Sequence, residues 1–215
     1  MSTLKADLTM SLDGYVAGPN PTLDEPLGKG GEELHEWLIA TRAWRASHGK
    51  EGGETGVDSE IAEELESGSA ATVMGRKMFS GGSGPWEDDP KANGWWGEEP
   101  PFRQPVFVLT HHEREPLSLG ATTFEFVTDG AEPALERARE AAGGGDVQIA
   151  GGAEAVQQYL RSGDLAELRV HVAPILLGGG ARLLDNLGDD PPKLERIRAV
   201  ESPSGVIHLS YRVGA

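Results

Sequence analysis

The chain has 215 residues, of which 38% are hydrophobic, with a formal net charge of −16 and no cysteine. The absence of cysteine excludes disulfides, zinc–thiolate sites and thiol nucleophiles, and the acidic charge argues against nucleic acid and anionic membranes as partners. The length fits one large domain or two very small ones, and we expect a single domain over residues 1–215. The sequence shows neither a run of about 18 apolar residues nor a signal-peptide pattern, so we expect a cytoplasmic protein.

The first third of the chain is predicted to contain two strands around a helical region. Residues 4–12 form a strand pattern, and the Pro- and Gly-rich segment 19–31 is expected to be a loop. An apolar stripe at helical spacing follows over residues 34–44. Asp58 is a candidate N-cap for a short helix, and residues 70–74 are expected to form a buried strand.

Residues 80–104 are rich in Gly, Pro and Trp, and this length is unusual for a simple connection. The next elements expected, in chain order, are strands at 105–110 and 123–128, a helix at 133–142, a strand at 147–150, a helix at 153–162, and strands at 167–177, 194–202 and 206–213. Alternating strands and helices followed by antiparallel strands predict a three-layer α/β fold. Its mixed, mostly parallel central sheet would end in a C-terminal antiparallel hairpin.

Two strand–glycine–helix junctions are the most informative local features. Gly75 follows the strand at 70–74, and Gly151-Gly152 follows the strand at 147–150. A helix that begins on unpaired N–H groups attracts anions through these donors and its macrodipole. Since Arg76 and Lys77 follow the first glycine, we expect a phosphorylated dinucleotide as the ligand.

Five segments in this order resemble the dihydrofolate reductase-like superfamily. The resemblance is closer to the reductase domain of bifunctional riboflavin-biosynthesis proteins and its stand-alone relatives. The segments are SLDGYVAG (11–18), VMGRKMF (73–79), PVFVLTHH (105–112), VQIAGGAEAVQQYL (147–160) and ELRVHVAPILLGGGARLLDNL (167–187).

The resemblance implies that NADPH lies across the carboxyl edge of the sheet, without the Gly-x-Gly-x-x-Gly fingerprint of Rossmann folds. The implied cofactor positions are Gly75, Arg76 and Lys77 for the adenosine side and its 2′-phosphate, Gly151, Gly152 and Ala153 for the pyrophosphate, Thr110 and His111 beside the adenosine, and Val16 and Ala17 near the nicotinamide.

Two acidic residues are candidates for catalysis. Asp13 follows the first strand, where its carboxylate would accept hydrogen bonds from a substrate or form an Asx-turn into Gly14. Glu33 lies roughly where dihydrofolate reductases carry their substrate-binding acid, and it is also a favourable acid for a first helical turn. The sequence leaves open whether either acid or an ordered water supplies a proton.

The tryptophans and histidines of the middle region each allow two interpretations. Trp86, Trp95 and Trp96 would either stack on a flat heterocycle or cover the core or an interface between subunits. His111-His112 has no further ligands at metal-binding spacing, so we expect no metal site.

The sequence therefore predicts an NADPH-dependent reductase that transfers a hydride to a small pterin- or pyrimidine-like heterocycle. The alternative is a non-catalytic nucleotide-binding module of the same fold. Relatives often pair, so the resemblance also implies a homodimer.

Overall fold

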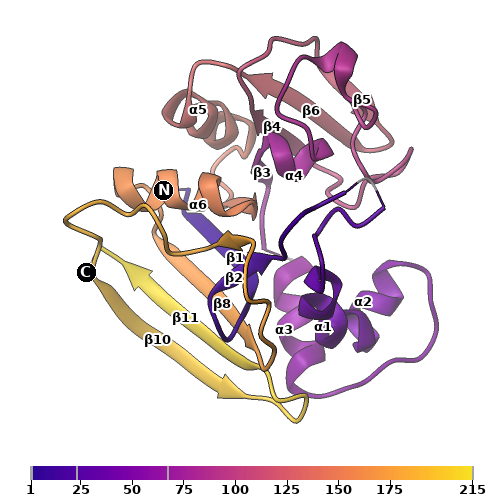
Figure 1. Cartoon of the computed structure of the whole chain (residues 1–215), viewed down its shortest axis with the longest axis vertical. Helices are drawn as coiled ribbons and strands as arrows, with labels where there is room; N and C mark the ends of the chain where they lie inside the picture. The colour runs from indigo at the N-terminus through magenta and orange to yellow at the C-terminus, as the bar shows by residue number, and fades with distance from the viewer. Residues whose placement is uncertain (1, 23, 67, 215) are drawn as a thin grey trace.

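The computed structural model describes residues 2–22, 24–66 and 68–214. Within these residues, one central sheet of nine strands runs through the molecule (Figure 1). In spatial order its strands are β10 (Leu194–Glu201), β11 (Ile207–Val213), β8 (Glu167–Ala173), β1 (Leu4–Ser11), β7 (Val147–Gly151), β3 (Ala71–Gly75), β4 (Pro105–Leu109), β6 (Thr122–Val127) and β5 (Leu117–Leu119).

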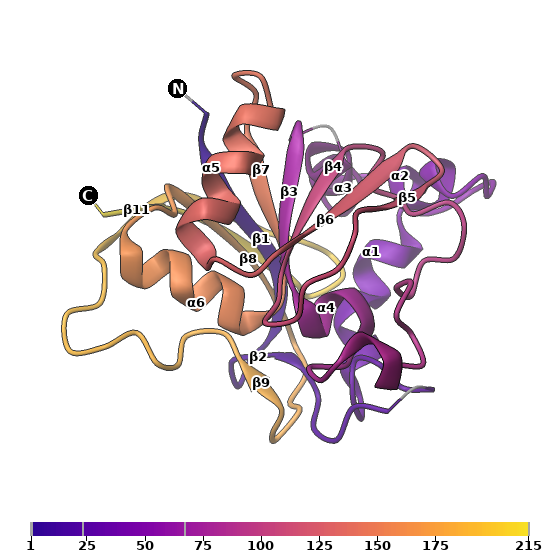
Figure 2. The same ribbon diagram turned by 90° about the horizontal axis from the view of Figure 1, so that it is seen from above.

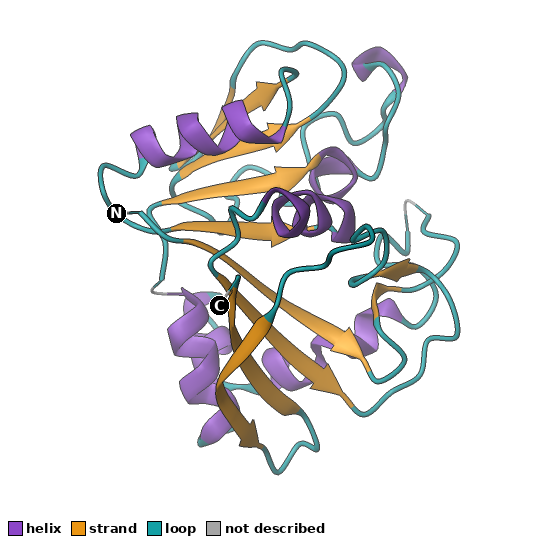
Figure 3. Cartoon of the chain, turned by 90° about the vertical axis from the view of Figure 1, so that its left-hand side faces the viewer, coloured by secondary structure: helices purple, strands orange, loops and turns teal. Residues whose placement is uncertain are grey.

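The six consecutive strands β8, β1, β7, β3, β4 and β6 are parallel to one another. Antiparallel pairs occur at the two ends, where β11 joins β8 and β10, and β5 joins β6. This confirms the predicted mixed sheet and C-terminal hairpin. The strands fan out across the molecule, as expected from the usual twist of a sheet (Figure 3).

Helices cover both faces of the sheet, which gives the predicted three layers (Figure 2). α5 and α6 lie on one side, and α1 and α3 lie on the other. The helices are η1 (Gly31–His35), α1 (Glu36–Ala40), α2 (Arg42–Ser47), α3 (Val57–Glu66), α4 (Arg76–Ser80), η2 (Trp86–Asp88), α5 (Ala131–Ala141) and α6 (Ala153–Ser162). No described helix is long and apolar enough to cross a membrane.

Alternation along β1 divides its side chains between the two layers. Leu4 and Ala6 belong to the main core cluster, together with residues of α5 and α6. Thr9 belongs to the opposite face, where its hydroxyl accepts a hydrogen bond of 3.1 Å from the indole N–H of Trp37 in α1. One face of β1 is therefore apolar and the other carries polar groups under α1 and α3.

The long loop after α4 covers a second, aromatic core. Trp86 and Trp96 pack against a cluster that includes Phe79 and Phe124, with Phe79 and Phe124 ring centroids 5.0 Å apart. These contacts support the covering interpretation for both tryptophans and tie the loop to α4 and β6.

Three local predictions differ from the structure. The strand expected at 167–177 ends at Ala173 as β8, directly before Pro174. The apolar stripe at 34–44 is not one helix, because the chain is extended at Thr41, which ends α1 and caps α2 by accepting the Trp44 N–H at 3.2 Å. Asp58 does not cap α3 but lies inside it, and its carboxylate binds His208 instead.

A small second sheet lies beside the carboxyl end of β1. β2 (Tyr15–Ala17) pairs antiparallel with β9 (Ala181–Arg182). This places the segment after β1 against the segment after β8.

Candidate functional site

The two glycine junctions adjoin at the carboxyl edge of the sheet, because β3 and β7 are parallel neighbours. A methyl group added to Gly75 would lie 3.7 Å from the backbone N of Gly152 and 3.9 Å from the carbonyl O of Gly151. Gly75 leads into α4 and Gly152 leads into α6. The chain therefore brings two helix beginnings, about 75 residues apart in sequence, to one place.

The start of α6 is open to a ligand. No side chain caps the helix at Gly152, and a methyl group added there would meet nothing within 4 Å. Gly151 has a φ of +125°, which favours glycine at this position. An anionic group can therefore approach the N–H groups that begin α6 without meeting a side chain.

An exposed ion pair links the first turns of the two helices. The Nζ of Lys77 in α4 lies 3.0 Å from Oε1 of Glu154 in α6, with side-chain exposures of 63% and 75%. Lys77 therefore presents a solvent-accessible cation at the predicted phosphate position.

Arg76 differs from expectation, because it does not present a free guanidinium at this edge. Its side chain is only 7% exposed, its Nη2 lies 2.5 Å from Oδ2 of Asp89, and its guanidinium stacks 3.5 Å above the Trp86 ring. Nε and Nη1 are buried and have no hydrogen-bond partner among the described residues. The loop after α4 folds over Arg76, so a cofactor phosphate would compete with Asp89 for it.

Asp89 is ionised in this setting. Burial raises the pKa of its carboxyl, but the Ser80 hydroxyl, the Lys91 N–H and Arg76 outweigh burial and hold the pKa below its ordinary value. The Ser80 hydroxyl donates at 2.7 Å and the Lys91 N–H at 2.9 Å.

Thr110 and His111 follow β4, beside the Gly75 junction, because Gly75 and Leu109 are register partners. Thr110 is buried, and its hydroxyl accepts the N–H of His112 at 3.2 Å. His111 is exposed at the edge. Thr110 therefore shapes the turn that presents His111.

A hollow of about 570 Å³ lies at the same edge, past the end of β6. Its lining includes two arginines, Arg114 and Arg137, and three carboxylates, those of Glu113, Glu115 and Asp129. The hollow therefore continues the edge formed by the ends of β3 and β4.

Asp13 connects β1 to the loop after β8. Its Oδ1 accepts the Ser11 hydroxyl at 2.6 Å and the Leu177 N–H at 3.1 Å, and its Oδ2 accepts the Gly178 N–H at 2.7 Å. The Ser11 hydroxyl lowers the pKa of Asp13, slight burial opposes this, and the two N–H groups add to it, so the pKa lies below its ordinary value. Asp13 is thus an ionised carboxylate that holds the loop after β8 against the end of β1. One hydrogen-bond acceptor position remains on its Oδ2.

Glu33 is exposed in η1, and its carboxyl lies near Gly30. A methyl group added to Gly30 would lie 3.7 Å from Oε1 of Glu33 and 3.2 Å from Cδ2 of Leu177. The two candidate acids therefore flank the same loop after β8.

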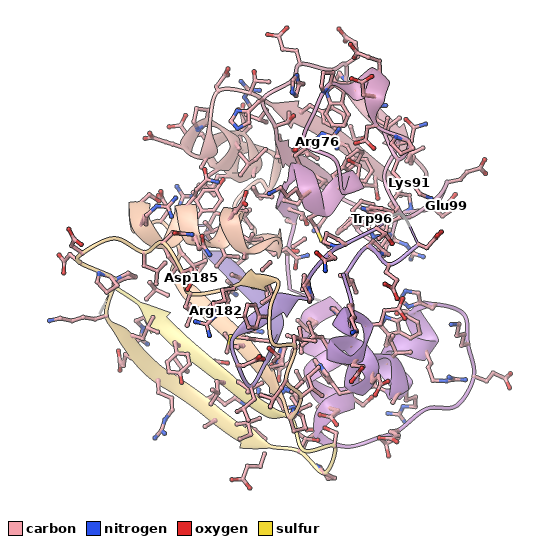
Figure 4. The ribbon with its side chains drawn as sticks, viewed as in Figure 1. Arg76, Lys91, Trp96, Glu99, Arg182 and Asp185 are labelled. Carbon is pink, nitrogen blue, oxygen red and sulfur yellow. The ribbon has the colours of Figure 1, made fainter. Side chains whose placement is uncertain are left out.

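Val16 and Ala17 lie in β2, half-buried beside that loop. Arg182, labelled in Figure 4, donates to the carbonyl O of Asp13 at 2.9 Å and lies over the Tyr15 ring. Among the described residues, no group of three or more His, Cys, Asp or Glu side chains is arranged to hold a metal ion.

Sequence reasoning missed Asp89 as the partner of Arg76. The carboxylate lies 13 positions further along a loop without periodicity, and no local signal relates the two side chains.

A family model described as the RibD C-terminal domain matches residues 2–208. The chain belongs to the RibD C-terminal domain family. This confirms the resemblance stated from the five sequence segments.

Solved structures share the fold of this RibD C-terminal domain at low sequence identity. A protein from Shewanella sp. PV-4 assigned to riboflavin biosynthesis is 21% identical, with full coverage of both chains and a TM-score of 0.62. Acinetobacter baumannii RibD is 15% identical over all of this chain and 59% of its own, with a TM-score of 0.58. Enterococcus faecalis dihydrofolate reductase, solved with NADP(H), is 13% identical over 99% and 97% of the two chains, with a TM-score of 0.51.

No curated protein matches the sequence significantly. Family membership and the fold support a reductase of the dihydrofolate reductase-like kind.

Proposed function

We propose that this protein is an NADPH-dependent reductase that transfers a hydride to a small pterin- or pyrimidine-like heterocycle. The observation that carries the proposal is the adjacency of two helix beginnings without a side-chain cap, at Gly75 and Gly152, after neighbouring parallel strands. A fold neighbour from Thermotoga maritima, 12% identical and covered over 56% of its length, is named a diaminohydroxyphosphoribosylaminopyrimidine deaminase/5-amino-6-(5-phosphoribosylamino)uracil reductase, and the reductase part of that name suits the heterocycle class.

The residues present fit a dinucleotide. The N–H groups at Gly152 and Ala153 would bind the pyrophosphate, because no side chain blocks them. Thr110 and His111 would border the adenosine, for which the adjoining hollow offers room. Val16 and Ala17 would lie near the nicotinamide, and bound NADPH would supply the hydride.

We propose different roles for the two acids. Asp13 is held as a carboxylate by three donors, so it would orient a substrate N–H or O–H through its remaining acceptor position. Glu33 has an exposed carboxyl on the other side of the loop after β8, and it would deliver the proton.

Reduction of candidate substrates tests the activity. Purified protein would be mixed with NADPH and either dihydrofolate or a ribosylamino-uracil, and the loss of reduced nicotinamide absorbance followed. We expect substrate-dependent oxidation of NADPH. Saturable NADPH binding without turnover on any substrate would favour the non-catalytic nucleotide-binding module, and absence of binding would contradict both functions.

We propose Lys77 as the group that recognises the 2′-phosphate, with Arg76 held behind it by Asp89. Lys77→Glu is expected to weaken NADPH binding about 10- to 100-fold and NADH binding far less, since a hydrogen bond to a charged group contributes about 1.5–3 kcal/mol. Isothermal titration with both coenzymes measures the difference.

Glu154→Gln is the matched variant, because it removes the carboxylate that pairs with Lys77. It should leave Lys77 freer and tighten NADPH binding selectively. Equal losses of NADPH and NADH affinity in Lys77→Glu would show that Lys77 does not recognise the 2′-phosphate.

We also propose a homodimer that forms through β10 and β11. Leu194, Ile197 and Ile207 on this hairpin are 43%, 53% and 42% exposed, and β10 is uncovered along almost its whole length. β10 is an edge strand, whose unpaired backbone groups can pair with a second chain, and the exposed apolar side chains add contact area. Sedimentation velocity should show a dimer that Ile197→Glu converts to a monomer; a monomeric wild-type protein would refute the pairing.

A further inference from the structure

Four side chains from four elements form a continuous buried chain of contacts away from the carboxyl edge. Asp7 Oδ1 lies 2.6 Å from Nε2 of His171, and Nδ1 of His171 lies 2.7 Å from Nδ1 of His208. Nε2 of His208 lies 2.8 Å from Oδ1 of Asp58 in α3. The two histidines are only 4% and 3% exposed, so water does not complete their hydrogen bonds.

The surroundings of this chain are apolar in the middle and charged at the ends. The Trp37 ring packs against both imidazoles, with centroid distances of 4.9 Å to His171 and 5.1 Å to His208. At the Asp7 end of this chain of contacts, the carboxyl lines a hollow of about 200 Å³ and is 15% exposed. Protons can therefore exchange with solvent at Asp7.

Charged groups face the chain from β8, α3 and β10. Arg169 Nη1 lies 3.9 Å from Asp7 Oδ2 and 3.9 Å from Glu64, and Arg169 Nε lies 2.7 Å from Glu167. Arg198 pairs with Glu64 at 2.9 Å and lies on the His208 side. Lys5 shares the hollow with Asp7. These cations and carboxylates pair largely with one another. The hydrogen-bond partners of the two histidines at Nε2 are therefore Asp7 and Asp58.

The three contacts require three protons. An ionised carboxylate only accepts, so Nε2 of each histidine must donate to its aspartate. The remaining Nδ1–Nδ1 contact of 2.7 Å needs one proton between the rings. Two neutral imidazoles carry only two protons, so the closed chain contains one more, and its net charge is −1.

We propose that Asp7, His171, His208 and Asp58 form a buried binding site for one proton, whose occupancy locks α3 and Trp37 onto the sheet. Without this proton, one of the three contacts would join two lone pairs. With a further proton, two N–H groups would face each other across the Nδ1–Nδ1 contact. The contacts therefore close with one proton bound.

This proton count sets the pH dependence of stability. Burial lowers the pKa of His208, and the hydrogen bond from its Nε2 to Asp58 acts in the opposite direction. In the unfolded chain both histidines titrate near pH 6.5. Above that pH the unfolded state binds one proton fewer than the folded state, so the unfolding equilibrium constant rises about tenfold per pH unit. The unfolding equilibrium constant also rises as pH falls below about 6.5, because the unfolded state then binds one proton more than the folded state.

Asp58→Asn tests the count, because its amide can donate to Nε2 of His208. The chain then closes with two neutral imidazoles and needs no additional proton. Above about pH 7, urea unfolding should show wild-type stability falling as pH rises, by up to tenfold per unit in the unfolding constant while the folded pair keeps its proton, and almost no dependence in Asp58→Asn. Asp129→Asn, which removes an exposed carboxylate paired with Arg137, should keep the wild-type slope.

Asp7→Asn repeats the test from the other end if Asp58→Asn does not fold. Histidine nitrogen NMR at about pH 7.5 should show one shared positive charge on the His171–His208 pair in the wild type and none in either variant. Equal pH slopes in wild type and variants, or two neutral rings in the wild type, would overturn the proposal.

Hydrogen exchange tests separately whether the bound proton holds Trp37 against the sheet. The Trp37 indole N–H, which donates to Thr9, should exchange with solvent faster at pH 9 than at pH 7.5, beyond the ordinary chemical effect of pH, in the wild type but not in Asp58→Asn. Identical exchange behaviour in the two proteins would show that the proton does not hold α1 in place.

Discussion

Gly152→Val is expected to lower the affinity for both NADPH and NADH by about 100-fold while the protein stays folded. The valine side chain would occupy the open space before α6, where the pyrophosphate would otherwise accept backbone hydrogen bonds. Two lost hydrogen bonds to a charged group, at about 1.5 kcal/mol each, correspond to roughly this factor. Titration calorimetry with each coenzyme measures it.

The fold should tolerate this change. A methyl group at Gly152 meets nothing within 4 Å, so the first carbon of the added side chain would not collide with the described residues. Gly84→Val is the matched control, because a side chain at Gly84 also enters open space. Unchanged coenzyme affinity in a folded Gly152→Val protein would move the pyrophosphate site elsewhere and remove the main support for the reductase.

Asp89→Ala is expected to destabilise the protein by about 3–5 kcal/mol, because it leaves the buried Arg76 guanidinium without its carboxylate. The two side chains are 7% and 3% exposed, so water cannot replace the lost partner. For a chain of this size, the change corresponds to a fall in Tm of about 10 °C. Calorimetry and urea unfolding both measure it.

Two variants separate the charge effect from other causes. Asp88→Ala removes the exposed neighbouring carboxylate and should leave the Tm nearly unchanged. The double variant Arg76→Met/Asp89→Leu replaces the pair with apolar groups and should recover most of the lost stability. It should also keep its preference for NADPH over NADH if Lys77 recognises the 2′-phosphate. Wild-type stability in Asp89→Ala would mean that the ion pair does not hold the loop over Arg76.

The lowered pKa of Asp89 makes the stabilisation from the Arg76–Asp89 ion pair depend on pH. Because the folded pKa is lower than the unfolded pKa, this stabilisation is present above the unfolded value near 3.9 and is lost as pH falls through the folded value. The difference in unfolding free energy between Asp88→Ala and Asp89→Ala should therefore shrink as pH falls below about 4.

The local patterns predicted most of the longer elements and several of their ends correctly, but not the short strands β2, β5 and β9. Gly163 ends α6 with a φ of +78° at the predicted residue, and the strands that became β10 and β11 pair as predicted. These features depend on glycine conformation and hydrophobic periodicity, which are properties of short segments. The break at Thr41 escaped prediction because its residues keep an apolar stripe on both sides of the break.

The amino-acid sequence by itself determined the layered α/β architecture, the family and the two glycine bends, because backbone preferences and apolar spacing act over a few residues. The tertiary structure decided which side chains meet. It placed Gly75 beside Gly152, enclosed Arg76 with Asp89 and Trp86, and joined Asp7 to His171 across 164 positions and Asp58 to His208 across 150. Such pairs depend on strand order and register, which are set by burial over the whole chain rather than by any segment of it.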